Sequence, residues 1–242
     1  SALATSTTSS NNTAVGYNAL LANTTGTQNN AVGGAALSAT TTGSYNNAFG
    51  YQALTTNTTG QENAAFGNMA VKFNTTGSYD TGVGSYALYE NTTGSNNTAV
   101  GYQSLEKNTT ANDNTALGYR ALKTTTTGSN NVGIGASALT ANTTGSTNVA
   151  IGIAALQACT TASGNTAIGS YALTSNTASN NTAVGNDSLY NNTSGTQNTA
   201  VGEGALKANT DQASNTGIGY RALYSQTAGN MNTAVGRNAM YS

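Results

Sequence analysis

Glycine recurs at a fixed interval along the chain, and this interval constrains the fold more than any other feature. The series begins at Gly16 and ends at Gly236 with a 17-residue spacing, and a single shorter step lies between Gly169 and Gly185. A period of this length is typical of repeat proteins, in which each unit packs only on its neighbours. We therefore expect residues 1–242 to form a single repeat array without a linker or a second domain.

Other residue types keep fixed places around each of these anchor glycines. A large apolar residue directly precedes the glycine in every copy, and Leu follows it four residues later, except where Val71 or Met240 replaces it. These two positions predict the core, which we expect to contain Val15, Leu20, Val100, Leu105, Ile168 and Leu173. Four residues before the glycine stands Asn, with Asp80 as the exception. This column predicts either a ladder of side-chain amides or a tight turn.

The length of the repeat limits the secondary structure of each unit. Two helices do not fit into a repeat of this length, whereas one coil of a β-solenoid does. Residues 13–15 are β-prone, residues 17–21 predict a second short element, a strand or a single helical turn, and residues 23–26 have turn composition. We expect an all-β fold, a parallel β-solenoid (β-roll) of about fourteen 17-residue coils.

The strand is apolar at neighbouring positions, which point to opposite faces. Ala14 and Val15 show this pattern, and only Ala or Gly occupies the position of Ala14 in other copies. A strand buried on both faces has such a sequence. We expect Val15 to fill the interior and Ala14 to pack against another chain in a homo-oligomer. A homotrimer is the simplest closed arrangement, and a dimer or a second layer of the same chain stays open as an alternative.

Composition excludes several classes of function. Only 6% of the residues are charged, so a basic surface for nucleic acid is lacking. No apolar run is long enough for membrane insertion. Histidine is absent, which removes the usual general base and the commonest metal ligand. We expect no enzyme activity, no metal and no cofactor, and the lone Cys159 rules out a disulfide within the chain.

The units NTAVGYNALLANTTG and NTAVGYQSLEKNTT resemble the head repeats of trimeric autotransporter adhesins. They are also similar to repeat arrays of phage tail-fibre and bacterial surface proteins, although the adhesin unit is shorter. The resemblance implies a trimeric, left-handed parallel β-roll. It also implies an extracellular fibre or adhesin at a cell surface or on a virion, which serves surface display, attachment or filament formation. Both chain ends lie inside a repeat, so copies of the chain could also associate end to end in a filament.

Three further patterns suggest surface chemistry. Acceptor patterns for N-glycosylation on expected turns occur at Asn23, Asn57, Asn74, Asn91, Asn108 and Asn142. Exposed contacts with surface glycans are suggested by the residue after the anchor glycine at Tyr17, Tyr51, Tyr102, Tyr119 and Tyr220. A receptor-binding segment of a phage tail fibre is therefore the main alternative function. The paired threonines of the turns suggest an ice-binding solenoid as the second alternative.

Overall fold

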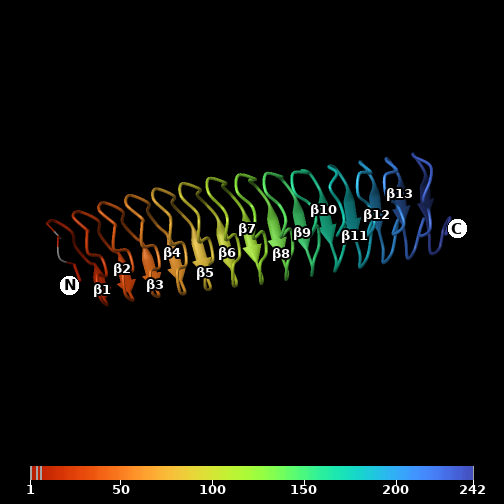
Figure 1. Ribbon diagram of the computed structural model, residues 1–242. Coiled ribbons are helices and arrows are strands. Elements are labelled where there is room, and N and C mark those ends of the chain that lie inside the picture. Colours follow the sequence, from red (N-terminus) through yellow and green to blue (C-terminus); the bar gives the residue numbers. More distant parts are fainter. Residues whose placement is uncertain (1, 4, 6, 242) are drawn as a thin grey trace. The chain divides into compact units, whose positions relative to one another are not determined.

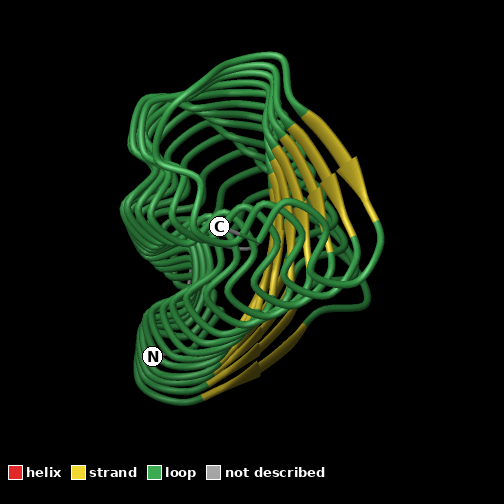
Figure 2. Cartoon of the chain, turned by 90° about the vertical axis from the view of Figure 1, so that its right-hand side faces the viewer, coloured by secondary structure: helices red, strands yellow, loops and turns green. Residues whose placement is uncertain are grey.

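Each coil of the chain contains one short strand, and the coils stack on one another. The computed structural model describes residues 2–3, 5 and 7–241, and the chain divides into two units, residues 1–127 and 128–242. Both units consist of the same coil (Figure 1). Figure 2 shows the strands in yellow, and the rest of each coil is loop and turn.

Parallel pairing in register joins the strands within each unit. In unit 1, Ala14 lies opposite Ala31 and Val15 opposite Val32, and the same alignment continues from coil to coil. Unit 2 repeats this arrangement. The strands of unit 1 are β1 (Thr13–Val15), β2 (Asn30–Val32), β3 (Asn47–Phe49), β4 (Ala64–Phe66), β5 (Thr81–Val83), β6 (Thr98–Val100) and β7 (Thr115–Leu117). Those of unit 2 are β8 (Val132–Ile134), β9 (Val149–Ile151), β10 (Thr166–Ile168), β11 (Thr182–Val184), β12 (Thr199–Val201), β13 (Thr216–Ile218) and β14 (Thr233–Val235). The expected all-β parallel solenoid, with one coil for each sequence repeat, is thereby confirmed.

The segment that follows each strand is neither a second strand nor a helical turn, so that expectation was wrong. Asn18 and Leu20 both have left-handed backbone conformations, with φ of 57° and 49°, and this pair recurs in the following coils. Each left-handed residue redirects the chain, which prevents a regular element from forming. The backbone bonds instead to the next coil, as Leu20 N donates to Ala36 O at 3.0 Å. Stacking therefore stabilises a backbone conformation that a single coil would not favour.

The anchor glycine marks the end of the strand. Gly16 has φ of +129°, and a β-carbon added to it would lie 2.6 Å from Gly33 O of the next coil. Only glycine combines this backbone conformation with such a close approach of two backbones. The recurrence of glycine at this place thus follows directly from the stacking of the coils.

Small residues, and not large ones, face the interior from the strand. Ala31, Ala48 and the other alanines of this column are fully buried against the leucine column, where Leu20, Leu105 and Leu173 are 0% exposed. The prediction for these three leucines is confirmed, but Val15, Val100 and Ile168 point outward, with Val15 57% and Ile168 38% exposed. The reason is the narrow interior: a β-carbon added at Gly82 would lie only 2.5 Å from Val71 Cγ2. Our expectation that Ala14 faces another chain and Val15 faces the interior is therefore reversed.

Two ladders, built mainly of asparagine, run through the interior of each unit, and other residues replace asparagine in a few coils. In the predicted column, Asn29 Oδ1 accepts hydrogen bonds from the backbone N and the Nδ2 of Asn46, at 2.9 and 3.2 Å. A second column lies in the turn, where Asn74 Nδ2 donates to Asn57 Oδ1 at 2.9 Å. Both columns meet at one carbonyl, because Asn46 Nδ2 and Asn57 Nδ2 each donate to Gly60 O. The amide ladder that the sequence predicted is confirmed and has a partner that the sequence analysis did not identify.

Candidate functional surfaces of the coil

The six candidate glycosylation sites lie inside the coils. All six asparagine side chains are 0% exposed, and they belong to the second amide ladder: Asn23, Asn57, Asn74, Asn91, Asn108 and Asn142. The nitrogen to which a glycan would be attached donates a hydrogen bond to the carbonyl at the end of its own turn, as Asn57 Nδ2 does to Gly60 O at 3.0 Å. A glycan has no room there, so the prediction of glycosylation on exposed turns is wrong. Asparagine occupies this turn position because its side chain forms the buried ladder, and not because it carries a glycan.

Substitutions in this ladder test its contribution to stability. We expect Asn57→Ala to lower the free energy of unfolding by roughly 1–3 kcal/mol, because Asn74 Nδ2 loses an acceptor inside the protein.

The reciprocal change is Thr40→Asn. Thr40 interrupts the ladder, and within the described residues neither Thr40 Oγ1 nor Asn23 Oδ1 has a hydrogen-bond partner. We expect Thr40→Asn to raise stability by about 1 kcal/mol. Urea unfolding followed by circular dichroism measures both, and a loss of stability in both variants would contradict the ladder.

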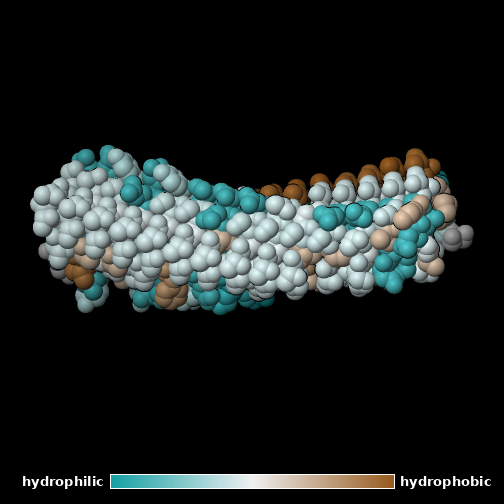
Figure 3. Space-filling model, turned by 90° about the horizontal axis from the view of Figure 1, so that it is seen from above, coloured by the Kyte–Doolittle hydropathy of each residue, from teal (hydrophilic) through white to brown (hydrophobic). Residues whose placement is uncertain are grey.

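In each unit, the outward-facing residues of the strands form a row of large apolar side chains, and we call the two rows together the apolar strip. Phe49 and Phe66 lie in it with their rings stacked, their centroids 4.9 Å apart and the planes 5° apart. Figure 3 shows the part of the strip that belongs to unit 2 as a row of brown atoms. Exposed fractions along the strip include 46% for Leu117 and 39% for Ile218. The strip comprises Val15, Val32, Phe49, Phe66, Val83, Val100 and Leu117 in unit 1, and Ile134, Ile151, Ile168, Val184, Val201, Ile218 and Val235 in unit 2.

A second surface carries most of the aromatic and charged side chains of the protein. It is the outward side of the segment that runs from one to six residues after each anchor glycine, and we call it the aromatic arc. All seven Lys and Arg residues lie in it, as does every Tyr except Tyr45 and Tyr79. The Tyr residues expected as exposed contacts belong to this arc and are exposed, by 77% at Tyr17, 56% at Tyr51, 43% at Tyr102, 48% at Tyr119 and 37% at Tyr220.

Charges in the aromatic arc pair between coils. Lys107 bonds to Glu90, and Lys123 Nζ lies 3.3 Å from Glu106 Oε2; in both pairs the partners occupy the same place in successive coils. Lys207 Nζ lies 2.9 Å from Asp187 Oδ2. The hydrogen bond from Lys107 to Glu90 raises the pKa of Lys107 above its usual range. Cations also lie near rings, such as Lys72 Nζ at 4.9 Å from the centroid of Phe73.

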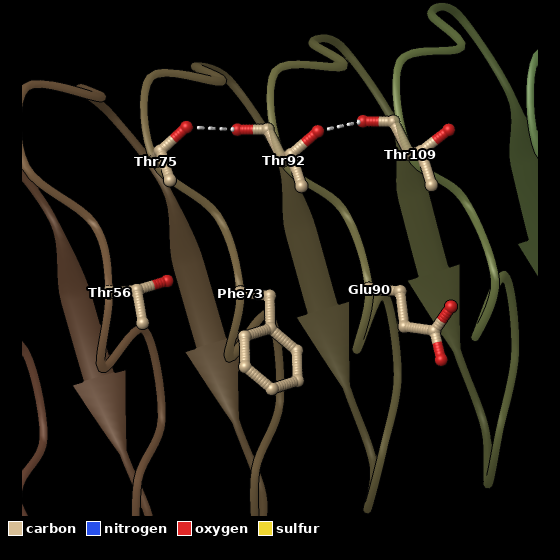
Figure 4. A pocket seen from close by; sticks show the side chains of 6 residues that line it. All are labelled: Thr56, Phe73, Thr75, Glu90, Thr92 and Thr109. Atoms are coloured by element: carbon tan, nitrogen blue, oxygen red, sulfur yellow. Dashed lines mark hydrogen bonds between the residues drawn. The ribbon is translucent and has the colours of Figure 1, made fainter.

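A groove lies in unit 1 between this arc and a row of threonines. Its volume is about 460 Å³, and Figure 4 shows the residues that line it: Thr56, Phe73, Thr75, Glu90, Thr92 and Thr109. The threonine row stands eight residues after the anchor glycine in successive coils. Its hydroxyls donate to the next coil, from Thr75 Oγ1 to Thr92 O at 2.9 Å and from Thr92 Oγ1 to Thr109 O at 2.8 Å. Sequence reasoning missed this groove, although Phe73 and Glu90 are unusually large among the small residues of their column.

Two ionisable side chains are buried in the interior. Asp80 occupies an asparagine position of the first ladder, where Oδ1 accepts from Asn97 N at 2.8 Å and Oδ2 accepts from Asn91 Nδ2 at 3.0 Å. Burial raises the pKa of Asp80 to about 7, against the lowering effect of these hydrogen bonds. Cys159 occupies the second ladder, is 0% exposed, and burial raises the pKa of its thiol to about 11. The buried position also keeps the Cys159 thiol away from the surface, where it would have to lie to form a disulfide with another chain.

Within residues 2–3, 5 and 7–241, no group of three or more His, Cys, Asp or Glu side chains is arranged to hold a metal ion. The same residues contain no helix of the length and hydropathy needed to cross a membrane. The sequence matches no protein-family model and none of the curated proteins with which it was compared.

Proposed function

We propose that the chain is a structural, non-enzymatic protein whose stacked coils associate with other copies through the apolar strip. The observation that carries the proposal is the alignment of large apolar side chains at one position of every strand, with Val15 57%, Phe66 41% and Val235 67% exposed. Monomeric soluble proteins seldom expose a contiguous apolar surface of this kind, because its contact with water is unfavourable. Covering the strip by a second copy removes that surface from water.

The geometry of the strip favours copies of the same chain over an unrelated partner. Its side chains repeat at the spacing of paired strands, about 4.8 Å, so an identical strip presents matching ridges and gaps along its length. Charged groups, which would have to be paired on burial, are absent from the strip positions. Three strips around a common axis would close the assembly, and a homotrimer is therefore our preferred state. The resemblance of the repeat units to adhesin heads extends the proposal to an extracellular rod or fibre for attachment or display.

Charged substitutions within the strip test this proposal. We expect wild-type protein to sediment as an oligomer and the double variant Phe66→Glu/Ile168→Glu to sediment with the mass of one chain. We expect the dissociation constant of this double variant to be about a hundredfold higher or more, because each copy would bury two unpaired carboxylates. The matched control is Tyr51→Glu/Ser170→Glu, which places the same charges directly after anchor glycines.

Sedimentation equilibrium gives the masses, and electron microscopy shows whether the oligomers are rods. Circular dichroism verifies that both double variants retain the β-solenoid, which we expect because Phe66 and Ile168 are 41% and 38% exposed. A wild-type protein that is monomeric at all concentrations, or a control that dissociates as much as the strip variant, would refute self-association through the strip.

Receptor binding is a second candidate function, favoured by the concentration of aromatic and charged residues in the arc and by the groove beside it. Residues of both types are common where proteins recognise ligands. The ice-binding alternative has weaker support, because the hydroxyls of the threonine row donate hydrogen bonds to backbone carbonyls, as Thr58 Oγ1 does to Thr75 O at 3.0 Å. Those donors are then not free to join a lattice of water.

A further inference from the structure

Two different borders flank the apolar strip in unit 1. One border is the aromatic arc, which follows the strand directly. The other lies five positions before each anchor glycine, and we call it the acidic flank. The ladder residue between this flank and the strand is buried, as at Asn63 and Asn114, so the flank continues the outward face of the strand. The residues of the flank are all exposed: Asn11, Gln28, Tyr45, Glu62, Tyr79, Asn96 and Asp113.

Opposite charges gather on these two borders. In unit 1 the aromatic arc holds four cations and two carboxylates, a balance of +2: Lys72, Lys107, Arg120 and Lys123 against Glu90 and Glu106. The acidic flank holds two carboxylates, Glu62 and Asp113, a balance of −2. Within the part of the chain that the structure describes, neither of these two carboxylates forms an ion pair. Each border therefore offers the charge that the other lacks.

The direction of two associated copies decides which borders meet. Copies related by rotation about an axis parallel to the stack of coils run in the same direction, and the acidic flank of one then lies beside the aromatic arc of the next. A twofold axis across the stack makes the copies antiparallel and places flank beside flank and arc beside arc. Because like charges at an interface are unfavourable, only the parallel direction gives complementary borders.

The positions along the stack match as well. Parallel copies carry the same residue at the same height, and a coil of 17 residues rises by about 4.8 Å, so residues seven positions apart differ in height by about 2 Å. Asp113 on the flank and Arg120 on the arc have this spacing. Tyr79 on the flank and Tyr86 on the arc have it too. In parallel copies an acid thus meets a cation, and an aromatic ring meets another ring.

The Arg120 side chain is held at its border. Its Nε donates to Gln103 Oε1 at 3.0 Å, and its guanidinium lies 4.9 Å from the centroid of the Tyr119 ring. A guanidinium has five N–H donors, which suits the two oxygens of a carboxylate. We propose that Asp113 of one copy pairs with Arg120 of the next, and that this contact makes associated copies run parallel. The contact rests on the self-association through the apolar strip that is proposed above.

Charge reversal tests the contact by sedimentation equilibrium of the full chain. We expect Asp113→Arg and Arg120→Asp each to raise the dissociation constant about tenfold or more, because each places like charges across every contact between copies. The effect is smaller than that of charges in the strip, since the borders lie at the rim. The double variant Asp113→Arg/Arg120→Asp restores opposite charges with exchanged places, and its dissociation constant should return to within about threefold of the wild-type value.

The matched control is Asp211→Arg, which makes the same change at an exposed turn residue outside both borders and should associate as wild type does. Circular dichroism verifies that each variant retains the β-solenoid. A monomeric wild-type protein would refute association through the strip and this contact with it. An oligomeric wild-type protein with an equally associated Asp113→Arg variant, or a double variant as weak as the single ones, would overturn the contact alone.

Discussion

We expect Asp80→Asn to raise the free energy of unfolding by roughly 4 kcal/mol at pH 8 and to have little effect near pH 3. The pKa of this carboxyl is about 7 in the folded protein, against 3.8 for an Asp side chain in water, which stands for the unfolded chain. Each unit of this difference corresponds to about 1.4 kcal/mol in the free energy of unfolding. The cause is burial of a charge in a ladder whose other members are neutral amides. Within the described residues, no Lys or Arg forms an ion pair with Asp80.

The direction of the pH dependence follows from proton binding. Because the folded protein holds the proton of Asp80 more tightly than the unfolded chain, folding takes up a proton between pH 3.8 and about 7. The contribution of Asp80 to stability is therefore fully present below pH 3.8, declines as the pH rises through this window, and is lost above about pH 7. The asparagine variant lacks this decline.

A neutral Asp80 also fits the ladder better than the charged form. In the preceding coil, Asn63 Nδ2 donates to Gly77 O at 2.9 Å, and a protonated carboxyl could donate to Gly94 O in the same manner. Urea unfolding of both proteins at a series of pH values measures the difference, with the exposed Asp113→Asn as the control. If the advantage of Asp80→Asn were the same at pH 4 and pH 8, burial of the charge would not be its cause.

The second large effect is expected for Gly101→Ala, which should lower the free energy of unfolding by roughly 3–5 kcal/mol. Gly101 has φ of +131°, which an alanine seldom adopts, and its new β-carbon would lie 2.5 Å from Gly118 O. The next coil would have to move away, and the backbone hydrogen bonds between the two coils would weaken. Thermal unfolding followed by circular dichroism measures this loss.

Gly94→Ala separates the backbone conformation from simple crowding. An added β-carbon at Gly94 would be equally close to a backbone oxygen, 2.3 Å from Ala111 O, but Gly94 does not have the positive φ of the anchor glycines. Alanine already stands in the corresponding place of two other coils, at Ala111 and Ala162. We expect a loss of about 1–2 kcal/mol for this variant. A loss as large as that of Gly101→Ala would show that contact distance, and not φ, selects glycine at the anchor.

Much of the interior could be predicted from the sequence because its features are local and repeat in every coil. The period of the glycines predicted the coil, the leucine four residues later predicted the core at Leu20, and the asparagine column predicted the amide ladder. In each case a position of the coil admits one main residue type, and the same position recurs in every coil because the coils stack in register. The glycosylation pattern was misleading for a related reason: the turn composition that gives Asn-Thr-Thr also supplies the second buried ladder.

The candidate site was less predictable, since it depends on residues that vary between coils. Phe73 and Glu90 lie in a column that holds mostly small or polar residues elsewhere, and Thr75 belongs to a different column. Only the closed path of the coil brings these columns to the two sides of one groove. The exposure of Tyr17 and its equivalents could be foreseen, because that column holds residues as different as Tyr, Gly, Asn and Glu.

The sequence by itself determined that the chain stacks short coils, one for each repeat, with glycine, leucine and asparagine at fixed places in each. It left open which face of the strand is inside, because Ala14 and Val15 are both apolar and adjacent residues always point to opposite faces. The tertiary structure decided this point through distance: the leucine column approaches the strand so closely that only alanine or glycine fits between them. The large residues are consequently on the outside, where they form the apolar strip.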